Sequence, residues 1–270
     1  MATVSLSTPT VISDRAEERH AHLGAVRRGD VASVHSWELV TAVDGPGTRM
    51  TLFLSGCPLR CQYCQNPDTW LQRNGTETSF DEIFARVVRY RSVFETTGGG
   101  LTISGGEPLQ QARFVTRLVR ETAALGIRTA LDTSGFLGRN ASDALLDDLS
   151  LVLLDVKSGL PETYREVTGR ELQPTIDFGN RLAARHVPAW VRFVLVPGLT
   201  DAVDNVDAAA DIVAKWPNVE RVEVLPFHQM GISKWERLNK PYSLTDTRSP
   251  EPELLERVRE QFRSRGLTTF

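Results

Sequence analysis

From residue 33 onward, short apolar runs alternate with stretches in which apolar residues recur every three or four positions. The short runs are typical of buried strands, and the longer spacing is typical of amphipathic helices. The pattern predicts strands over residues 34–43, 50–56, 100–104, 128–132, 151–156, 190–196 and 222–225. It predicts helices over about 79–90, 114–125, 161–167, 175–184, 203–215 and 253–265.

Strands that are apolar on both faces and separated by helices indicate a parallel sheet. Right-handed crossover connections then make such a sheet curl. The chain has 270 residues, a length that favours either a barrel or two domains. We therefore predict an α/β fold in one domain, a partial (β/α)6 TIM-like barrel.

The first 32 residues differ from the rest of the chain. They are rich in Ser, Thr, Ala, Glu and Arg and have no clean helical or alternating pattern. This composition predicts a flexible N-terminal extension over residues 1–32 and a folded core domain over residues 33–270.

The charge of the chain argues against a general attraction to polyanions. Lys and Arg number 31 against 34 Asp and Glu, which gives a net charge of -3. We therefore expect neither nucleic acid nor a membrane as partner. The N-terminus has no basic start followed by a long apolar core, so we predict a cytoplasmic protein.

All three cysteines of the chain, Cys57, Cys61 and Cys64, lie within one short segment. Three is an odd number for a disulfide framework, and no fourth Cys or His lies nearby to complete a structural zinc site. Three thiolates suit a four-iron, four-sulfur cluster whose fourth iron is open to another ligand. The alternatives are buried free cysteines or a zinc knuckle completed by a distant His.

Unusual residues follow the predicted strands on one side of the sheet. They are the cysteines and the motifs GGE, DTSG, DVK, PG and PFH. In a barrel of parallel strands the carboxyl ends of the strands form the active face. The pattern therefore places the candidate chemistry at that end.

The cysteine spacing, with Tyr63 just before the third cysteine, resembles that of the radical S-adenosylmethionine (SAM) superfamily. The resemblance extends to the pyruvate formate-lyase activating enzymes over roughly residues 36–270. It is carried, in order, by DGPGTR, SGCPLRCQYCQNPDTW, SGGEP, LDTSGF, LLDVK, VRFVLVPG and LPFHQMG. It implies a barrel of the radical SAM type, a [4Fe-4S] cluster on the three cysteines, and S-adenosyl-L-methionine on the open iron.

The resemblance also implies cofactor contacts. Asp155 and Lys157 stand two apart at a strand end, so both can point to one side, and Lys157 could neutralise the cofactor carboxylate. The competing interpretations are a surface ion pair for these two, a plain turn for the GGE motif, and a structural role for the histidine. The implied set is Tyr63, Cys64, Gln65, Gly105, Gly106, Glu107, Asp155, Val156, Lys157 and His228.

Further roles follow from the same resemblance. Asp132, Thr133 and Asp155 match positions that bind a monovalent cation, although Asp after a strand is also a common helix cap. Asp44 is a candidate for contact with the protein substrate. Arg192 is another, and if it points into the barrel it should meet a carboxylate or a phosphate-like group. Many relatives have His where this chain has Gln65, which puts proton-dependent tuning of the cluster in doubt.

The resemblance implies an enzyme that activates pyruvate formate-lyase. It would cleave S-adenosyl-L-methionine reductively to methionine and a 5′-deoxyadenosyl radical, which takes a hydrogen atom from a glycine. Flavodoxin or ferredoxin would be the reductant, and the enzyme would be a monomer. The alternatives are an activase of another glycyl-radical enzyme, or a zinc-binding, iron-sulfur or electron-transfer module. Three cysteines leave no ligands for the extra clusters of many other activases.

Overall fold

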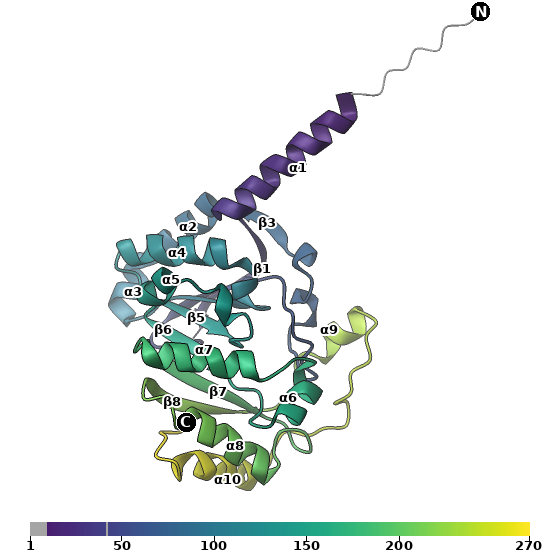
Figure 1. Cartoon of the computed structure of the whole chain (residues 1–270), viewed down its shortest axis with the longest axis vertical. Helices are drawn as coiled ribbons and strands as arrows, with labels where there is room; N and C mark the ends of the chain where they lie inside the picture. Colours follow the sequence, from purple (N-terminus) through teal and green to yellow (C-terminus); the bar gives the residue numbers. More distant parts are fainter. Residues whose placement is uncertain (1–9, 42) are drawn as a thin grey trace, which may run out of the picture.

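The computed structural model describes residues 10–41 and 43–270, whose strands form one open sheet with helices packed against it (Figure 1). The strands are β1 (Val31–Thr41), β2 (Arg49–Leu54), β3 (Thr76–Ser79), β4 (Gly100–Gly105), β5 (Thr129–Thr133), β6 (Leu151–Asp155), β7 (Ala189–Leu195) and β8 (Val219–Pro226). Their order in the sheet is β3-β1-β2-β4-β5-β6-β7-β8. β1 is antiparallel to β2 and β3, and all other neighbours are parallel.

Helices occupy the connections between the parallel strands. The α-helices are α1 (Thr10–Arg28), α2 (Phe80–Arg89), α3 (Arg91–Thr97), α4 (Ala112–Ala124), α5 (Asp143–Asp148), α6 (Pro161–Thr168), α7 (Gln173–Ala184), α8 (Val203–Val213), α9 (Ile232–Arg237) and α10 (Pro252–Arg263). Short 3-10 turns are η1 (Pro67–Thr69), η2 (Gln72–Asn74), η3 (Pro108–Gln111) and η4 (Gly138–Asn140). In the described part of the chain, no helix combines the length and the apolar character needed to cross a membrane.

The topology confirms the predicted α/β class and is consistent with the predicted partial barrel. The parallel strands are β2, β4, β5, β6, β7 and β8, as the six predicted main strands require. The strands at the two ends of the described sheet, β3 and β8, do not pair with each other, so the barrel is open.

The two faces of the sheet carry different residues because side chains alternate along each strand. Leu131, Val152 and Val191 belong to the main core between the sheet and the helices. The residues in between form a small separate cluster on the inner face, Ala130, Leu151, Leu153 and Trp190. Further along the same inner face, toward the carboxyl ends, the side chains become charged. The apolar cluster therefore closes one end of the barrel, and polar groups line the other.

The N-terminal segment contains a helix that its sequence pattern did not predict. Helix α1 projects from the body of the molecule, and only its last turns approach α4 (Figure 1). It ends at Gly29, which has the left-handed φ of 73°, a common helix ending. β1 starts at Val31, two residues before the predicted start of the core. Residues 1–9 of the predicted extension lie outside the described residues, and the division at residue 33 stays a prediction.

Four other elements were missing from the sequence prediction: strand β3 and the short helices α3, α5 and α9. Strand β3 has the polar sequence TETS and pairs only with β1 at the edge of the sheet, so it shows no apolar alternation. Helix α9 is only six residues long, too short for a periodic pattern to stand out. Short, polar or edge elements give weak signals because tertiary contacts rather than local sequence stabilise them.

A buried asparagine fixes the segment that follows β6. Asn205 of α8 is fully buried. Its Oδ1 accepts hydrogen bonds from Ser158 Oγ (2.6 Å), Gly159 N (3.0 Å) and Leu160 N (3.2 Å), and its Nδ2 donates to Thr200 O (2.8 Å). One buried amide therefore bonds four polar groups of this segment.

We predict that Asn205→Ala lowers the free energy of unfolding by about 2–4 kcal/mol, because the buried Gly159 amide loses its acceptor and the buried Thr200 carbonyl loses its donor. Urea denaturation followed by circular dichroism measures the loss. Gln173→Ala removes an exposed side chain bonded only to Asp177 and serves as the control. A loss below about 1 kcal/mol, the typical worth of a single hydrogen bond, would contradict the role given to Asn205.

Candidate functional site

The three cysteines lie on one loop between β2 and η1, at the carboxyl ends of the strands. All three are free, and all three line a cavity of about 270 Å³. The loop is held from outside by α6, since Arg60 N donates to Thr168 O (2.8 Å) and Gln62 N to Val167 O (2.9 Å). The sulfurs are therefore presented to the cavity by a backbone that the neighbouring helix fixes.

The chemistry of this donor set fits a metal cluster. Burial raises the pKa of Cys61 to about 12, and it also raises the pKa values of Cys57 and Cys64. Metal ions bind the thiolate, so a metal must displace these protons and supply the missing positive charge. Within the described ranges, no three His, Cys, Asp or Glu side chains converge on a single ion. Three thiolates on one loop suit an iron-sulfur cluster, because such clusters are held by Cys thiolates.

The predicted pair Asp155 and Lys157 also lines this cavity. Lys157 Nζ lies 2.8 Å from Asp155 Oδ2, and the two side chains are 12% and 23% exposed, so the pair is not an ordinary surface ion pair. Burial alone would lower the pKa of Lys157, but Asp155 and the neighbouring Tyr63 and Cys61 raise it well above its usual value. The cavity thus contains one ammonium group and one carboxylate side by side.

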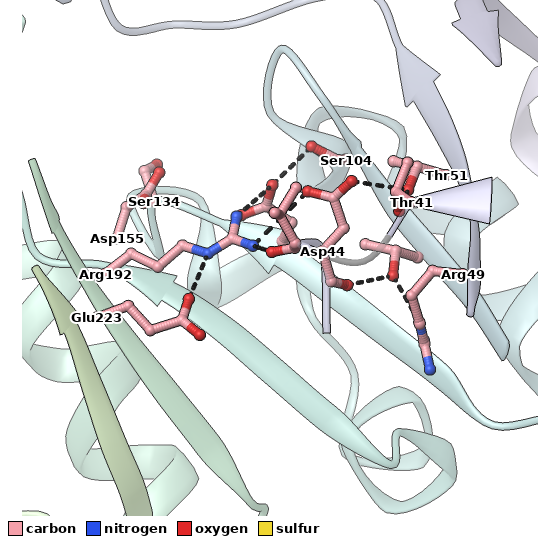
Figure 2. A network of polar contacts seen from close by, with 12 residues as sticks. Thr41, Asp44, Arg49, Thr51, Ser104, Ser134, Asp155, Arg192 and Glu223 are labelled. Carbon is pink, nitrogen blue, oxygen red and sulfur yellow. Dashed lines mark hydrogen bonds and ion pairs between the residues drawn. The ribbon is translucent and has the colours of Figure 1, made fainter. Parts of the chain in front are cut away.

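Arg192 of β7 stands at the centre of a buried charge network (Figure 2). Its guanidinium lies 3.6 Å from Asp44 Oδ1, 3.3 Å from Asp132 Oδ2 and 3.4 Å from Glu223 Oε2, and it donates to Val43 O (2.8 Å). Burial raises the pKa of Asp132 to about 6, although Arg192 acts in the opposite direction. The prediction that an inward Arg192 meets a carboxylate is confirmed.

The DGPGTR turn brings Asp44 into the cavity wall. Asp44 Oδ2 accepts from Thr51 Oγ1 (3.1 Å), and Asp44 O accepts from Thr102 Oγ1 (2.7 Å). At the other end of the motif the buried Arg49 donates to the same Thr102 hydroxyl (3.0 Å) and to Leu101 O. Burial lowers the pKa of Arg49 to about 10. The arginine of the motif therefore anchors the turn, while the aspartate faces the cavity.

The glycines of the GGE motif have a packing role in addition to the cofactor contact predicted for them. A Cβ on Gly105, whose φ is 119°, would lie 2.2 Å from Leu54 O, and one on Gly106 would lie 2.4 Å from Gly56 O. The glycines are thus needed because β2 and the start of the cysteine loop approach them closely. Both still line the cavity.

Glu107 and Val156 lie outside the cavity lining. The buried Glu107 carboxylate accepts from Thr133 Oγ1 (2.6 Å), Ser134 N (3.0 Å) and Ser134 Oγ (2.6 Å). It ties the end of β4 to the DTSG turn, and its contact with the cofactor stays a prediction. Val156 is buried in the main core. Of the predicted cation group, Asp132, Thr133 and Asp155 do share the cavity wall.

Tyr63 and Gln65 line the cavity, whereas His228, which follows β8, lies outside the lining and contacts Gln65. The Tyr63 ring lies 5.6 Å from Lys157 Nζ, and its hydroxyl is buried without a hydrogen-bond partner among the described residues. Gln65 Nε2 lies 3.1 Å from His228 Nε2, and His228 Nδ1 is likewise buried without a described partner. Unsatisfied polar atoms beside a cavity are suited to bind a polar ligand.

The sequence interpretation missed several residues of this site. Ser104 lines the cavity and donates to Asp132 Oδ2 (2.6 Å). Its position directly before the two glycines, at a strand end, was the available signal. The apolar part of the lining consists of side chains that look like ordinary core residues in the sequence, Phe53, Leu59, Trp70, Val194, Leu225 and Phe227. Together with the charged end, they make the cavity amphipathic.

Comparisons with known proteins agree with this geometry. Residues 51–209 match the family model of the radical SAM superfamily. A pyruvate formate-lyase-activating enzyme of Clostridium pasteurianum is 40% identical over 220 residues, which cover 82% of this chain and 92% of that protein. A pyruvate formate-lyase 1-activating enzyme of Escherichia coli K12 is 38% identical over 231 residues, covering 85% of this chain and 94% of that one.

Solved structures support the fold. Streptococcus suis SuiB bound to its precursor peptide SuiA gives a TM-score of 0.62 at 15% identity, over 99% of this chain and 55% of that one. A domain of a pyruvate-formate lyase-activating enzyme from Bacteroides vulgatus gives 0.52 at 22% identity, over 64% of this chain and 98% of that one. The sequence relatives and the family model together show that this chain belongs to the radical SAM superfamily and, within it, to the family of pyruvate formate-lyase-activating enzymes, which use a [4Fe-4S] cluster and S-adenosylmethionine.

Proposed function

We propose that this chain activates pyruvate formate-lyase by generating a glycyl radical on it. One observation carries the proposal: the three cysteines and the Asp155–Lys157 pair, which are far apart in the sequence, line one amphipathic cavity at the carboxyl ends of the strands. When bound together, the cluster and S-adenosylmethionine supply a one-electron cleavage that yields methionine and a 5′-deoxyadenosyl radical able to take a hydrogen atom from glycine.

The protein's own residues bind and orient the reactants. Cys57, Cys61 and Cys64 would hold the cluster. The ammonium of Lys157 and the carboxylate of Asp155 match the opposite charges of the amino-acid end of S-adenosylmethionine, and the apolar lining with Tyr63 suits its nucleoside. His228 would contribute to cofactor binding by positioning Gln65, to which it is hydrogen-bonded. The buried setting keeps water from the charged groups, which strengthens their interactions.

The polar network around Arg192 would contact the glycine segment of the partner enzyme. Asp44 is held in the cavity wall by Thr51 and Arg192, and its position there supports a substrate-contact role for both charged residues. Asp132, Thr133 and Asp155 would hold a monovalent cation; the Thr133 hydroxyl donates its proton to Glu107 and keeps an oxygen lone pair for the cation. We further propose flavodoxin or ferredoxin as the reductant, a monomeric enzyme, and a cytoplasmic location.

The test of the function is anaerobic incubation of the reconstituted protein with pyruvate formate-lyase, S-adenosylmethionine and a chemical reductant. We expect an electron paramagnetic resonance signal of a glycyl radical on the partner, together with formation of 5′-deoxyadenosine. A partner with its radical-bearing glycine replaced by alanine serves as the control. Cofactor cleavage without any signal on pyruvate formate-lyase would point to another glycyl-radical partner.

We predict that Ala at any one of Cys57, Cys61 or Cys64 reduces the iron content below about four per chain and abolishes formation of 5′-deoxyadenosine. Iron analysis and chromatography of the products measure the two effects. Gln62→Ala lies in the same loop but bonds Glu166 and Ser243 outside the cavity, so it should retain both properties. A cysteine variant that keeps full iron and turnover would exclude that thiol as a ligand.

We predict that Lys157→Ala weakens S-adenosylmethionine binding by about 10–100-fold, because the buried carboxylate of Asp155 loses its partner and the ligand carboxylate loses a cation. Calorimetry on the reconstituted protein measures the change, and the iron content should stay the same. Because the pKa of Lys157 is raised, binding by the wild type should not decline through loss of this charge between pH 7 and about pH 10. Unchanged affinity in the variant would remove Lys157 from the site.

A further inference from the structure

Three exposed cations lie on the outer side of the cysteine loop. Arg60 Nη1 donates to Cys57 O and to Leu59 O, both at 2.7 Å, and Arg170 Nε donates to Pro58 O at 2.8 Å. Lys240, which follows α9, is also exposed. We call Arg60, Arg170 and Lys240 the cysteine-loop cations. Among the described residues, none of them has a carboxylate within ion-pair distance.

A tryptophan separates two of these cations, Arg60 and Lys240, from the cavity. The guanidinium of Arg60 lies 4.9 Å and Lys240 Nζ 5.4 Å from the centre of the Trp70 ring. Trp70 itself is buried and lines the cavity. Cys57 N donates to Trp70 O at 3.1 Å, and the three cysteines line the same cavity as Trp70. The indole therefore lies between two of the surface cations and the cavity that the cysteines line.

A second tryptophan packs against Trp70 and helps to cover the cysteine loop. Trp235 of α9 packs against Trp70 with ring centres 5.1 Å apart, and its Nε1 donates to Cys64 O at 2.8 Å. Tyr242 continues the aromatic cluster, with its ring centre 5.2 Å from that of Trp235. The cysteine loop is thus covered by an aromatic cluster of Trp70, Trp235 and Tyr242. The exposed Arg60 still bonds the backbone of Cys57 directly, so a partner on this surface has a short approach to the loop.

The charge of this surface indicates the kind of partner it fits. The whole chain has a net charge of -3. The cysteine-loop cations nevertheless form a local positive surface that carboxylates of the described residues do not neutralise. This surface lies over the loop whose cluster must receive an electron. A positive patch on an otherwise acidic protein steers partners of negative surface charge. An acidic protein is therefore the complementary occupant.

Resting on the proposed function, we infer that an acidic one-electron carrier protein docks on the cysteine-loop cations and delivers its electron across Trp70. The carrier, a flavin or iron-sulfur protein, is oxidised by one electron, and the cluster held by the three cysteines is reduced by one. No proton or covalent bond is exchanged in this step. The S-adenosylmethionine cavity on the inner side of the loop stays free during docking.

A second basic surface provides the matched control. A groove of about 1450 Å³ between α1, η2 and α4 is lined by seven arginines and two glutamates. It is separated from the cysteines by η3 and by Gly56, against which the Gln110 side chain packs. Arg120 lines this groove, is exposed, and has no carboxylate partner in the described ranges. Arg120→Glu changes the net charge of the chain by the same amount as Lys240→Glu, but at a surface that does not include Trp70.

The experiment measures docking and electron transfer separately on the reconstituted protein. Binding of oxidised flavodoxin is followed by flavin fluorescence, and cluster reduction by reduced flavodoxin is followed by anaerobic stopped-flow absorbance. We expect Lys240→Glu to weaken binding and slow reduction about tenfold at low salt, and to flatten the salt dependence of both. Arg120→Glu should match the wild type. Reduction by dithionite, which needs no docking surface, should be equally fast in all three proteins.

The outcomes decide between the two surfaces. The inference would be overturned if Lys240→Glu bound flavodoxin as tightly as the wild type does. It would also be overturned if Arg120→Glu lost more flavodoxin affinity than Lys240→Glu. Because Lys240 bonds no atom of the cysteine loop, its reversal leaves the iron ligands in place, and iron content verifies this. Failure of dithionite-reduced wild type to cleave S-adenosylmethionine would contradict the proposed function instead, and the fluorescence measurement would still test docking.

Discussion

The interior of this molecule is organised by the need to compensate charge that is buried at the carboxyl ends of parallel strands. Asp44, Asp132 and Glu223 are largely removed from water, and each lies within ion-pair distance of Arg192. Buried carboxylates of this kind are tolerated only when cations and hydrogen-bond donors surround them. One arginine on β7 thereby joins β5, β8 and the turn before β2. Arg192 therefore helps to fix the strands and the turn that form the cavity wall.

The same requirement explains why the cavity suits a charged cofactor. Lys157 and Asp155 neutralise each other, so the cavity presents both signs of charge without a large net cost. The three thiols beside them are stabilised in their protonated form by burial, and only a group that carries positive charge can convert them to ligands. Metal binding, cofactor binding and compensation of buried charge are thus parts of one electrostatic arrangement.

The cysteine loop depends on contacts from both sides. On one side, backbone carbonyls of α6 accept hydrogen bonds from the amides of the loop. On the other side, Trp235 of α9 donates a hydrogen bond to Cys64 O. Gly231, just before α9, approaches Gln65 so closely that a Cβ would lie 2.8 Å from its Cα. The C-terminal part of the chain therefore covers the loop, and this cover determines which surface an electron donor can reach.

The sequence by itself determined the order of the parallel strands, the cysteine trio and the end of the sheet where the chemistry gathers. These features are local or follow from topology, because every right-handed crossover brings the next strand's carboxyl end to the same side. It also predicted that Arg192, if it pointed into the barrel, would meet a carboxylate or a phosphate-like group, because an unpaired buried charge is costly. The spacing of Asp155 and Lys157 similarly placed both on one face.

Only the tertiary structure decided which way the turn residues point and what covers them. Glu107 turns toward Ser134 instead of the cavity, and the glycines before it are required by a strand some fifty positions earlier in the chain, β2. Helix α9 and Trp70 meet over the cysteines although 165 positions separate Trp70 from Trp235. Side-chain direction in a turn depends on partners distant in sequence, and no local periodicity records those partners.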